Sequence, residues 1–123
     1  RMHQAKMNSE EEFLIWGTGE PLREFLHVDD LATAIKKVIE VETNESLINV
    51  GSSEEISIKR LAESLKNVIG YKGLLGFDKS KPDGNPRKLL DSTKILELGW
   101  RPEIGLNEGL LDTYEWFIKN VAL

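Results

Sequence analysis

Apolar residues recur at helical spacing in three parts of the chain. After Asp29 or Asp30, the expected cap, they fall every three or four residues up to Glu42, which predicts an amphipathic helix. A second helix is expected between Ser57, its cap, and Gly70, a natural helix stop. Asn107 is the expected cap of the last helix. The apolar positions are Leu31, Ala34, Ile35, Val38 and Ile39 in the first; Ile58, Leu61, Ala62, Leu65, Val68 and Ile69 in the second; and Leu110, Tyr114, Phe117 and Val121 in the third.

Short apolar runs lie between these helices and predict strands. Two further helices are expected, one at the very start of the chain and one that Ser92 caps and Gly99 stops, with Trp100 packing back. A loop with two prolines and one glycine covers residues 78–88. Strands and helices alternate, so the predicted fold class is α/β. The expected strands are 13–16, 25–28, 47–50 and 73–77, and the two short helices are 1–6 and 93–98.

The stretch from Gly17 to Asp30 joins a turn, a strand and a helix. Gly17, Gly19 and Pro21 favour a turn, since glycine tolerates positive φ and proline fixes one turn angle. Arg23 stands between this turn and the strand that follows, where an anion can reach its guanidinium. An arginine beside a turn is more often simply solvated, so this stretch alone predicts only the order of the elements.

Composition narrows the class of protein. The 123 residues make one domain's worth of chain, with 40% apolar and 30% charged residues, which is ordinary for a globular protein. The net charge of −5 argues against a general nucleic-acid binder, but an anionic small molecule needs only local positive charge. No apolar run is long enough for a membrane span, and the first ten residues lack the apolar core of a signal peptide. A cytoplasmic location is therefore expected.

The sequence lacks the residues that several kinds of chemistry need. The chain has no cysteine, and two distant histidines do not make a metal site, so His3 and His27 are interpreted as structural. Gly17-Thr-Gly19 leads into a proline and a strand, whereas a dinucleotide fingerprint needs a third glycine and a helix. A Tyr-x-x-x-Lys pair is also missing, because Ile118 follows Tyr114 at that spacing and Leu75 follows Tyr71.

The order of three motifs resembles a known family. Arg23-Glu-Phe-Leu-His-Val-Asp-Asp30, Lys81-Pro-Asp-Gly-Asn-Pro-Arg-Lys-Leu-Leu-Asp91 and Leu98-Gly-Trp100 resemble the extended short-chain dehydrogenases that act on nucleotide sugars, and among them the GDP-L-fucose synthases. The resemblance runs over essentially the whole chain. It implies that residues 1–123 are a C-terminal, GDP-sugar-binding portion without the N-terminal Rossmann half, and that residues 29–51 complete the Rossmann sheet of the full enzyme.

The resemblance also implies an activity for the full enzyme. That family converts GDP-4-keto-6-deoxy-D-mannose to GDP-L-fucose by 3,5-epimerisation and 4-reduction, with NADPH bound by the N-terminal half. The catalytic residues of the family are expected upstream of Arg1, so no catalytic residue is assigned here. A fragment that is inactive alone is expected, from a parent that is a homodimer or another homo-oligomer.

Six residues match substrate-binding positions of the family. Arg1, Arg23 and Lys88 match cationic contacts of the GDP moiety, and Trp16 matches a tryptophan that contacts the substrate. Lys81 and Asp83 belong to the loop that closes over the nucleotide. A guanidinium binds adjacent phosphate oxygens in a bidentate manner, which suits a diphosphate. Arg87 is a further basic candidate, and backbone groups near residues 74–77 are expected to discriminate guanine.

Two other interpretations stay open at this point. One is a different nucleotide-sugar enzyme of the same superfamily, such as a UDP-sugar epimerase or a GDP-mannose dehydratase, although the run Pro86–Asp91 favours the fucose synthases. The other is a non-catalytic α/β module that binds a partner protein or a nucleotide. Without neighbouring domains some apolar faces and strand edges stay uncovered, which predicts an oligomer or a partly rearranged fold.

Overall fold

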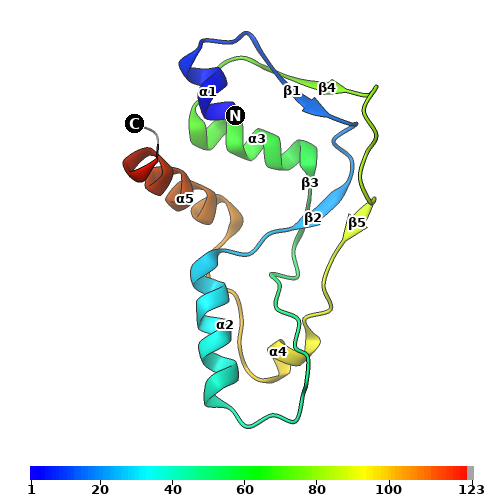
Figure 1. Cartoon of the computed structure of the whole chain (residues 1–123), viewed down its shortest axis with the longest axis vertical. Helices are drawn as coiled ribbons and strands as arrows, with labels where there is room; N and C mark the ends of the chain where they lie inside the picture. Colours follow the sequence, from blue (N-terminus) through cyan, green and yellow to red (C-terminus); the bar gives the residue numbers. More distant parts are fainter. Residues whose placement is uncertain (122–123) are drawn as a thin grey trace.

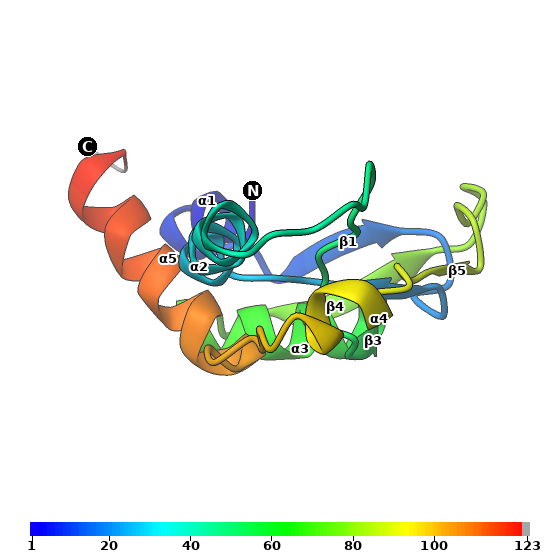
Figure 2. The same cartoon turned by 90° about the horizontal axis from the view of Figure 1, so that it is seen from below.

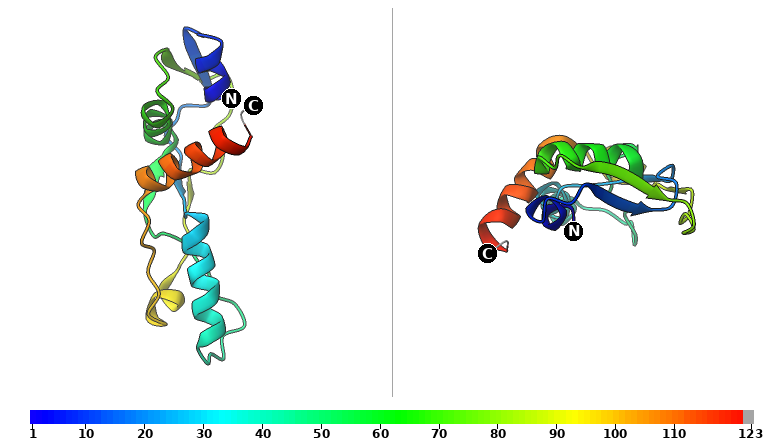
Figure 3. Two further views of the ribbon diagram at one scale, coloured as in Figure 1. Left: turned by 90° about the vertical axis from the view of Figure 1, so that its left-hand side faces the viewer. Right: turned by 90° about the horizontal axis from the view of Figure 1, so that it is seen from above.

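The computed structural model describes residues 1–121, and it has an elongated shape (Figures 1 and 3). Helices α1 and α3 lie with most of the strands at one end, α2 and α4 lie at the other end, and α5 begins between them. The elements along this part of the chain are α1 (Met2–Met7), β1 (Glu12–Trp16), β2 (Leu22–Glu24), α2 (Val28–Glu40), β3 (Glu55–Ser57), α3 (Ile58–Ile69), β4 (Leu74–Asp78), β5 (Arg87–Lys88), α4 (Thr93–Glu97) and α5 (Leu106–Asn120).

The strands form two small sheets, and the predicted α/β class is confirmed. β1 and β4 pair in parallel over their full lengths, with Trp16 opposite Asp78. β2 lies between β3, which runs antiparallel to it, and β5, which runs parallel. Seen from below, the helices α1, α2 and α5 gather on one side and the strands β1 and β5 on the other (Figure 2).

Each end of the molecule has its own small core. The core at the α1–α3 end, here the upper core, consists of Met2, Ala5, Ile69 and Tyr71, with Phe13, Leu65, Leu75 and Tyr114 packed against it. The core at the α2–α4 end, the lower core, consists of Ala34, Ile95 and Trp100, with Leu26, Val38, Ile48 and Val50 among the residues around it. Trp100 packs back as predicted, and its indole N–H donates to the hydroxyl of Thr33 over 2.9 Å.

The residues from Phe25 to Val28 do not form the predicted strand. β2 ends before them, and α2 already begins at Val28. His27 is the N-cap, with extended backbone (φ −67°, ψ 146°), and its Nδ1 accepts the N–H of Asp29 over 3.3 Å. The helix thus begins before the two aspartates predicted to cap it. Both stand in its first turn instead, where carboxylates suit the positive end of the helix dipole.

Asp30 fixes the approach to α5 rather than capping α2. Its side chain is buried, and its two carboxylate oxygens accept the backbone N–H groups of Glu103 and Ile104, each over 3.0 Å. His27 adds a second link, because its Nε2 lies 3.3 Å from the carboxylate of Asp112 on α5. These contacts connect the start of α2 to the start of α5.

Three further predictions about local structure are wrong or only partly confirmed. Residues 47–50 form no strand with any other described residue; they run without regular structure, and Ile48 and Val50 pack against the lower core. Ser92 is the N-cap residue of α4, as predicted, but its hydroxyl makes no capping hydrogen bond, and Asp91 accepts the N–H of Thr93 instead. α5 begins one residue before Asn107, with Gly105 as its N-cap.

Among residues 1–121, no helix combines the length and apolar character needed to cross a membrane.

Candidate anion-binding site

Arg23 and Lys88 stand side by side on neighbouring strands. They are direct partners in the parallel β2–β5 register, and residues paired in this way project from the same face of a sheet. Lys88 is exposed and Arg23 is half-buried. Two cations that the sequence separates by 64 intervening positions, from 24 to 87, are therefore brought together on one face, as an anion site between them requires.

The guanidinium of Arg23 is anchored to the loop that precedes β5. Its Nη1 donates to the carbonyl oxygen of Asn85 over 2.8 Å and to that of Leu22 over 2.6 Å. Both acceptors are neutral backbone groups, and no acidic side chain within residues 1–121 lies within 4.0 Å of this guanidinium. The positive charge of Arg23 is therefore oriented by the fold without being neutralised.

Trp16 and Lys81 form a second contact, between the end of β1 and the loop that follows β4. Trp16 ends β1 and 69% of it is exposed, so it does not fill a core. The Nζ of Lys81 lies 5.7 Å from the centroid of the Trp16 ring, within the range of a cation–π interaction. An exposed aromatic surface beside an ammonium group offers contacts to a ligand that carries both a ring and a negative charge.

Asp83 is bound to the Gly17–Gly19 turn. Its Oδ1 accepts the backbone N–H of Thr18 over 2.8 Å, and its Oδ2 accepts the hydroxyl of Thr18 over 2.6 Å. Both hydrogen bonds lower the pKa of the Asp83 carboxyl below its ordinary 3.8, and the bond from the hydroxyl has the larger effect. Asp83 is thus an ionised carboxylate that joins the loop to the turn.

Arg87 has its own partner. Its Nε and Nη2 both donate to the carboxylate of Glu55 on β3, each over 2.7 Å. The hydrogen bond with Glu55 raises the pKa of Arg87, and the same bond lowers the pKa of Glu55. Because its charge is paired across the β3–β2–β5 sheet, Arg87 is a weaker candidate for an anion than Lys88 beside it.

Arg1 is not brought to the other candidates within this chain. Its Cζ lies 5.4 Å from the centroid of the Phe13 ring. Phe13 and Trp16 are three positions apart on β1, so their side chains project from opposite faces of that strand, about 10 Å apart along it. Arg1 instead borders an apolar groove of about 410 Å³ between α1, α3 and α5.

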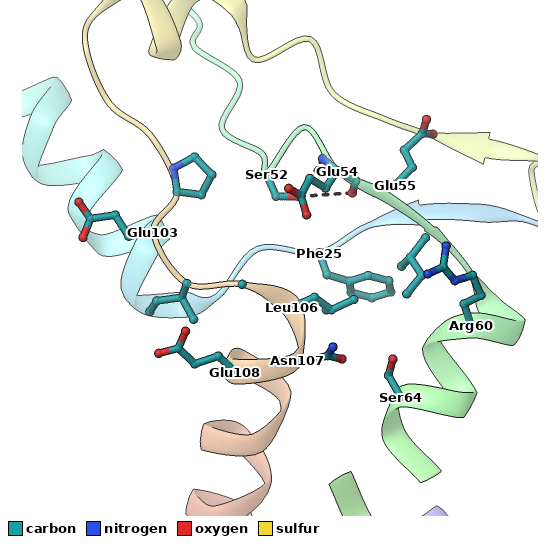
Figure 4. Close-up of a pocket in the computed structure, with 14 residues that line it drawn as sticks. Phe25, Ser52, Glu54, Glu55, Arg60, Ser64, Glu103, Leu106, Asn107 and Glu108 are labelled. Atoms are coloured by element: carbon teal, nitrogen blue, oxygen red, sulfur yellow. Dashed lines mark hydrogen bonds between the residues drawn. The ribbon is translucent and has the colours of Figure 1, made fainter. Parts of the chain in front are cut away.

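A second hollow, of about 640 Å³, opens between α3 and the start of α5 (Figure 4). Phe25 and Leu106 lie within it, and Arg60 and Ser64 project from α3 beside them. Glu54, Glu55, Glu103 and Glu108 also line it, so its carboxylates outnumber its one arginine. This hollow contains neither Arg23 nor Lys88, and its charge does not suit a diphosphate.

Three residues support the site although the sequence alone did not indicate them. Thr18 and Asn85 supply the partners of Asp83 and Arg23. Glu24, next to Arg23, accepts the N–H groups of Ser53 and Leu90 and so connects β2 to both flanking segments. Two turn glycines around one threonine are the single local signal for Thr18, whereas the other contacts depend on which strands pair.

Comparisons with known proteins point to one superfamily. The model of the NAD dependent epimerase/dehydratase family matches residues 1–51. GDP-L-fucose synthase 1 of Arabidopsis thaliana is 52% identical over 122 residues, which are 99% of this chain and 38% of that protein. A crystal structure of a GDP-L-fucose synthetase from Naegleria fowleri bound to NADP matches with a TM-score of 0.90 and 29% identity, over 98% of this chain and 38% of that one. A UDP-glucose 4-epimerase from Thermotoga maritima, solved with UDP-glucose, matches with a TM-score of 0.82 and 32% identity, over the same shares.

Fold and sequence together point to one class of protein: over nearly its whole length the chain is similar to part of the extended short-chain dehydrogenases of the NAD-dependent epimerase/dehydratase superfamily. The chain spans 38% of the length of the Arabidopsis relative. Within the superfamily, the predicted resemblance to the GDP-L-fucose synthases is confirmed over nearly the whole chain.

Proposed function

We propose that this chain is the C-terminal, GDP-sugar-binding part of a GDP-L-fucose synthase. In its complete form such an enzyme converts GDP-4-keto-6-deoxy-D-mannose to GDP-L-fucose by epimerisation at C3 and C5 and reduction at C4. The observation that carries the proposal is the pairing of Arg23 with Lys88 on one face of the β2–β5 pair. Two adjacent cations of this kind suit the two adjacent phosphates of a nucleoside diphosphate.

The remaining candidates have roles around this pair. Trp16, at the end of β1, and Lys81, in the loop between β4 and β5, supply an aromatic ring and a third cation, and Asp83 belongs to the same loop as Lys81. Arg1 joins the site only if the rest of the natural protein brings the ligand to that side of β1. Each charge-assisted hydrogen bond to a phosphate contributes about 1.5–3 kcal/mol, so two or three account for most of the preference over a neutral sugar.

NADPH would be held elsewhere in the complete enzyme. A pyrophosphate cradle needs a glycine-rich turn that leads into the N-terminus of a helix. Gly17 and Gly19 both have positive φ, but their turn leads into β2. The residues of this turn therefore do not fit the cofactor, and we assign no step of the reduction to them.

Helix α2 supports the proposal that residues 29–51 complete a Rossmann domain formed by the rest of the protein. Ala34 belongs to the lower core and Val38 packs against it, whereas Leu31, Ile35 and Ile39, on the adjoining flank of the same apolar stripe, are 41%, 54% and 79% exposed. An apolar stripe of a helix normally faces a core across its whole width. Burying one such side chain contributes about 1.5–3 kcal/mol, so covering this flank stabilises the assembled protein considerably.

A titration of GDP and of UDP against the complete natural protein tests the substrate class. A GDP-L-fucose synthase binds GDP more tightly than UDP, and Arg23→Ala weakens both because the diphosphate is common to them. Equal or tighter binding of UDP overturns the assignment. The likeness to a UDP-glucose 4-epimerase favours a UDP-sugar enzyme as the second candidate in that case.

A further inference from the structure

The loop between β4 and β5 is attached to the β1–β2 turn by a pair of hydrogen bonds, which we call the Thr18–Asp83 pair. Both carboxylate oxygens of Asp83 are engaged, one by the N–H and one by the hydroxyl of Thr18, over 2.8 and 2.6 Å. The two residues are 65 positions apart, and the turn and the loop that they join both lie between the β1–β4 and β2–β5 strand pairs. At the ends of these segments the N–H of Gly17 donates to the carbonyl of Asp78 and the N–H of Leu22 to that of Pro86.

Gly17 makes this close approach achievable. A Cβ built at Gly17 would overlap the carboxylate of Asp83, and the residue has φ +84°, a backbone conformation that other residues rarely adopt. The turn therefore presents the N–H of Thr18 to the loop with no side chain in between. The glycine, the threonine and the aspartate act as one unit.

The Thr18–Asp83 pair sits midway between two residues that contact the proposed binding groups. Two positions before Asp83, Lys81 lies over the Trp16 ring. Two positions after it, Asn85 accepts a hydrogen bond from Arg23. Hydrogen bonds to Asp78 and from Leu22 hold the two ends of the loop, and the attachment of Asp83 between them helps to place the ammonium of Lys81 and the carbonyl that orients the guanidinium of Arg23.

The charge of Asp83 also fits a supporting role better than a contact with phosphate. A carboxylate facing a diphosphate repels it and competes for the cations that would bind it. Among residues 1–121, Asp83 forms no salt bridge with any cation, and its oxygens are turned to Thr18 instead.

We infer that Asp83 is a positioning residue for GDP-sugar binding: through Thr18 it holds the loop from Lys81 to Asn85 in place, so that Lys81 and Arg23 face the diphosphate. The inference rests on the proposed function, and it gives Asp83 a different role from the direct contact that the family resemblance implies. The loop is then preorganised before the ligand arrives, which lowers the entropic cost of binding.

Three variants of the complete natural protein separate positioning from contact in a GDP titration. Asp83→Asn keeps both hydrogen bonds, because its Oδ1 still accepts the N–H of Thr18 and its amide N–H donates to the hydroxyl, so GDP binds within about twofold of the parent. Asp83→Ala loses both and weakens GDP binding about five- to tenfold, as two ordinary hydrogen bonds predict. Thr18→Val loses the hydrogen bond of the hydroxyl to Asp83, and with it the one that this hydroxyl accepts from the N–H of Glu20 over 3.2 Å, and weakens binding less. Combining it with Asp83→Ala adds far less than the Thr18→Val loss measured alone, because partners in one interaction are not additive.

Glu63→Ala is the matched control, because it removes one exposed carboxylate from α3 and is expected to leave GDP affinity unchanged. An Asp83→Asn protein as weak as Asp83→Ala overturns the inference, since the charge itself would then contact the ligand. Fully additive losses in the Thr18→Val, Asp83→Ala double variant overturn it too.

Amide hydrogen exchange tests the Thr18–Asp83 pair without any ligand. Peptides that cover residues 17–20 and 79–85 exchange faster in Asp83→Ala and in Thr18→Val than in the parent, but not in Asp83→Asn. Unchanged exchange within α3 shows that the fold is intact. A parent that does not bind GDP removes the proposed function, whereas loop exchange that Asp83→Ala leaves unaltered removes the positioning role.

Discussion

The two ends of the molecule differ in how their surfaces are completed. Around the two sheets, side chains of β2, β5 and the loop between β4 and β5 are engaged within the chain: Arg23 with Asn85, Arg87 with Glu55, and Asp83 with Thr18. At the α2–α4 end, the flank of α2 formed by Leu31, Ile35 and Ile39 stays exposed beside the lower core. The contacts at the first end suit a preformed binding surface. At the second end, the exposed apolar flank of α2 is the surface that we propose the rest of the protein covers.

The largest effect is expected in the lower core. Ile95 is fully buried, so Ile95→Ala removes contacts on every side and lowers the free energy of unfolding by about 2–5 kcal/mol in urea denaturation. Ile39→Ala makes the same chemical change on the exposed face of α2 and costs about 0.5 kcal/mol or less. In the complete natural protein the cost of Ile39→Ala rises toward that of Ile95→Ala. If Ile39→Ala costs as little in the complete protein as in the 123-residue chain, the proposed covering of that face is wrong.

The binding surface gives the next largest effect. Arg23→Ala in the complete protein raises the KM for the GDP-sugar by about tenfold or more, since ~1.4 kcal/mol is a factor of ten. Arg87→Ala serves as the control, because its guanidinium is already paired with Glu55 and its loss changes KM by less than about threefold. Steady-state kinetics check both. An Arg23→Ala enzyme with the parent KM refutes the role of this arginine.

Self-association of the 123-residue chain tests whether the exposed apolar residues of α2 drive contacts between copies. Exposed apolar faces associate to leave water, so sedimentation equilibrium is expected to show dimers or larger oligomers. Ile35→Glu places a charge in the exposed face of α2 and raises the dissociation constant severalfold. Lys36→Glu, one position along the helix, is the control and changes it little. A strictly monomeric parent chain would show that this face does not drive association.

A smaller effect concerns the pH dependence of stability. The hydrogen bond from Arg87 holds the pKa of Glu55 below its ordinary 4.5. A carboxyl whose pKa is lower in the folded state stabilises the fold above its unfolded pKa, and this contribution is lost as the pH falls through the folded one. The Tm of Arg87→Gln is therefore expected to fall less than the parent's between pH 6 and pH 3. Lys72→Gln, which removes one exposed positive charge that pairs with no carboxylate among residues 1–121, should keep the parent's profile.

The sequence predicted the elements whose signals are local. Ser57 caps α3 with its hydroxyl, and Gly70 ends that helix at φ 70°, as their positions indicated. The strands β1 and β4 lie within a residue of the predicted runs. Each of these depends on a cap, a stop or a short apolar run that can be recognised without knowing its neighbours.

The failures depend on residues far away in the sequence. Asp30 was expected to cap α2, but the N–H groups of Glu103 and Ile104 lie beside its carboxylate, and only the folded chain brings them there. The run 47–50 looks like a strand because it is apolar, yet a strand exists only where another pairs with it. At the site, Arg23 and Lys88 were separate candidates as basic residues, and Asp83 was a candidate only through the family resemblance. The sequence contained no sign that Asp83 would face Thr18.

A crystal structure of the complete natural protein with GDP tests the central claim most directly. The account predicts that the guanidinium of Arg23 and the ammonium of Lys88 both lie within hydrogen-bond distance of the same diphosphate, with Asp83 still bound to Thr18. A diphosphate that contacts only one of the two cations, or that lies in the hollow lined by Phe25 and Arg60, would contradict it.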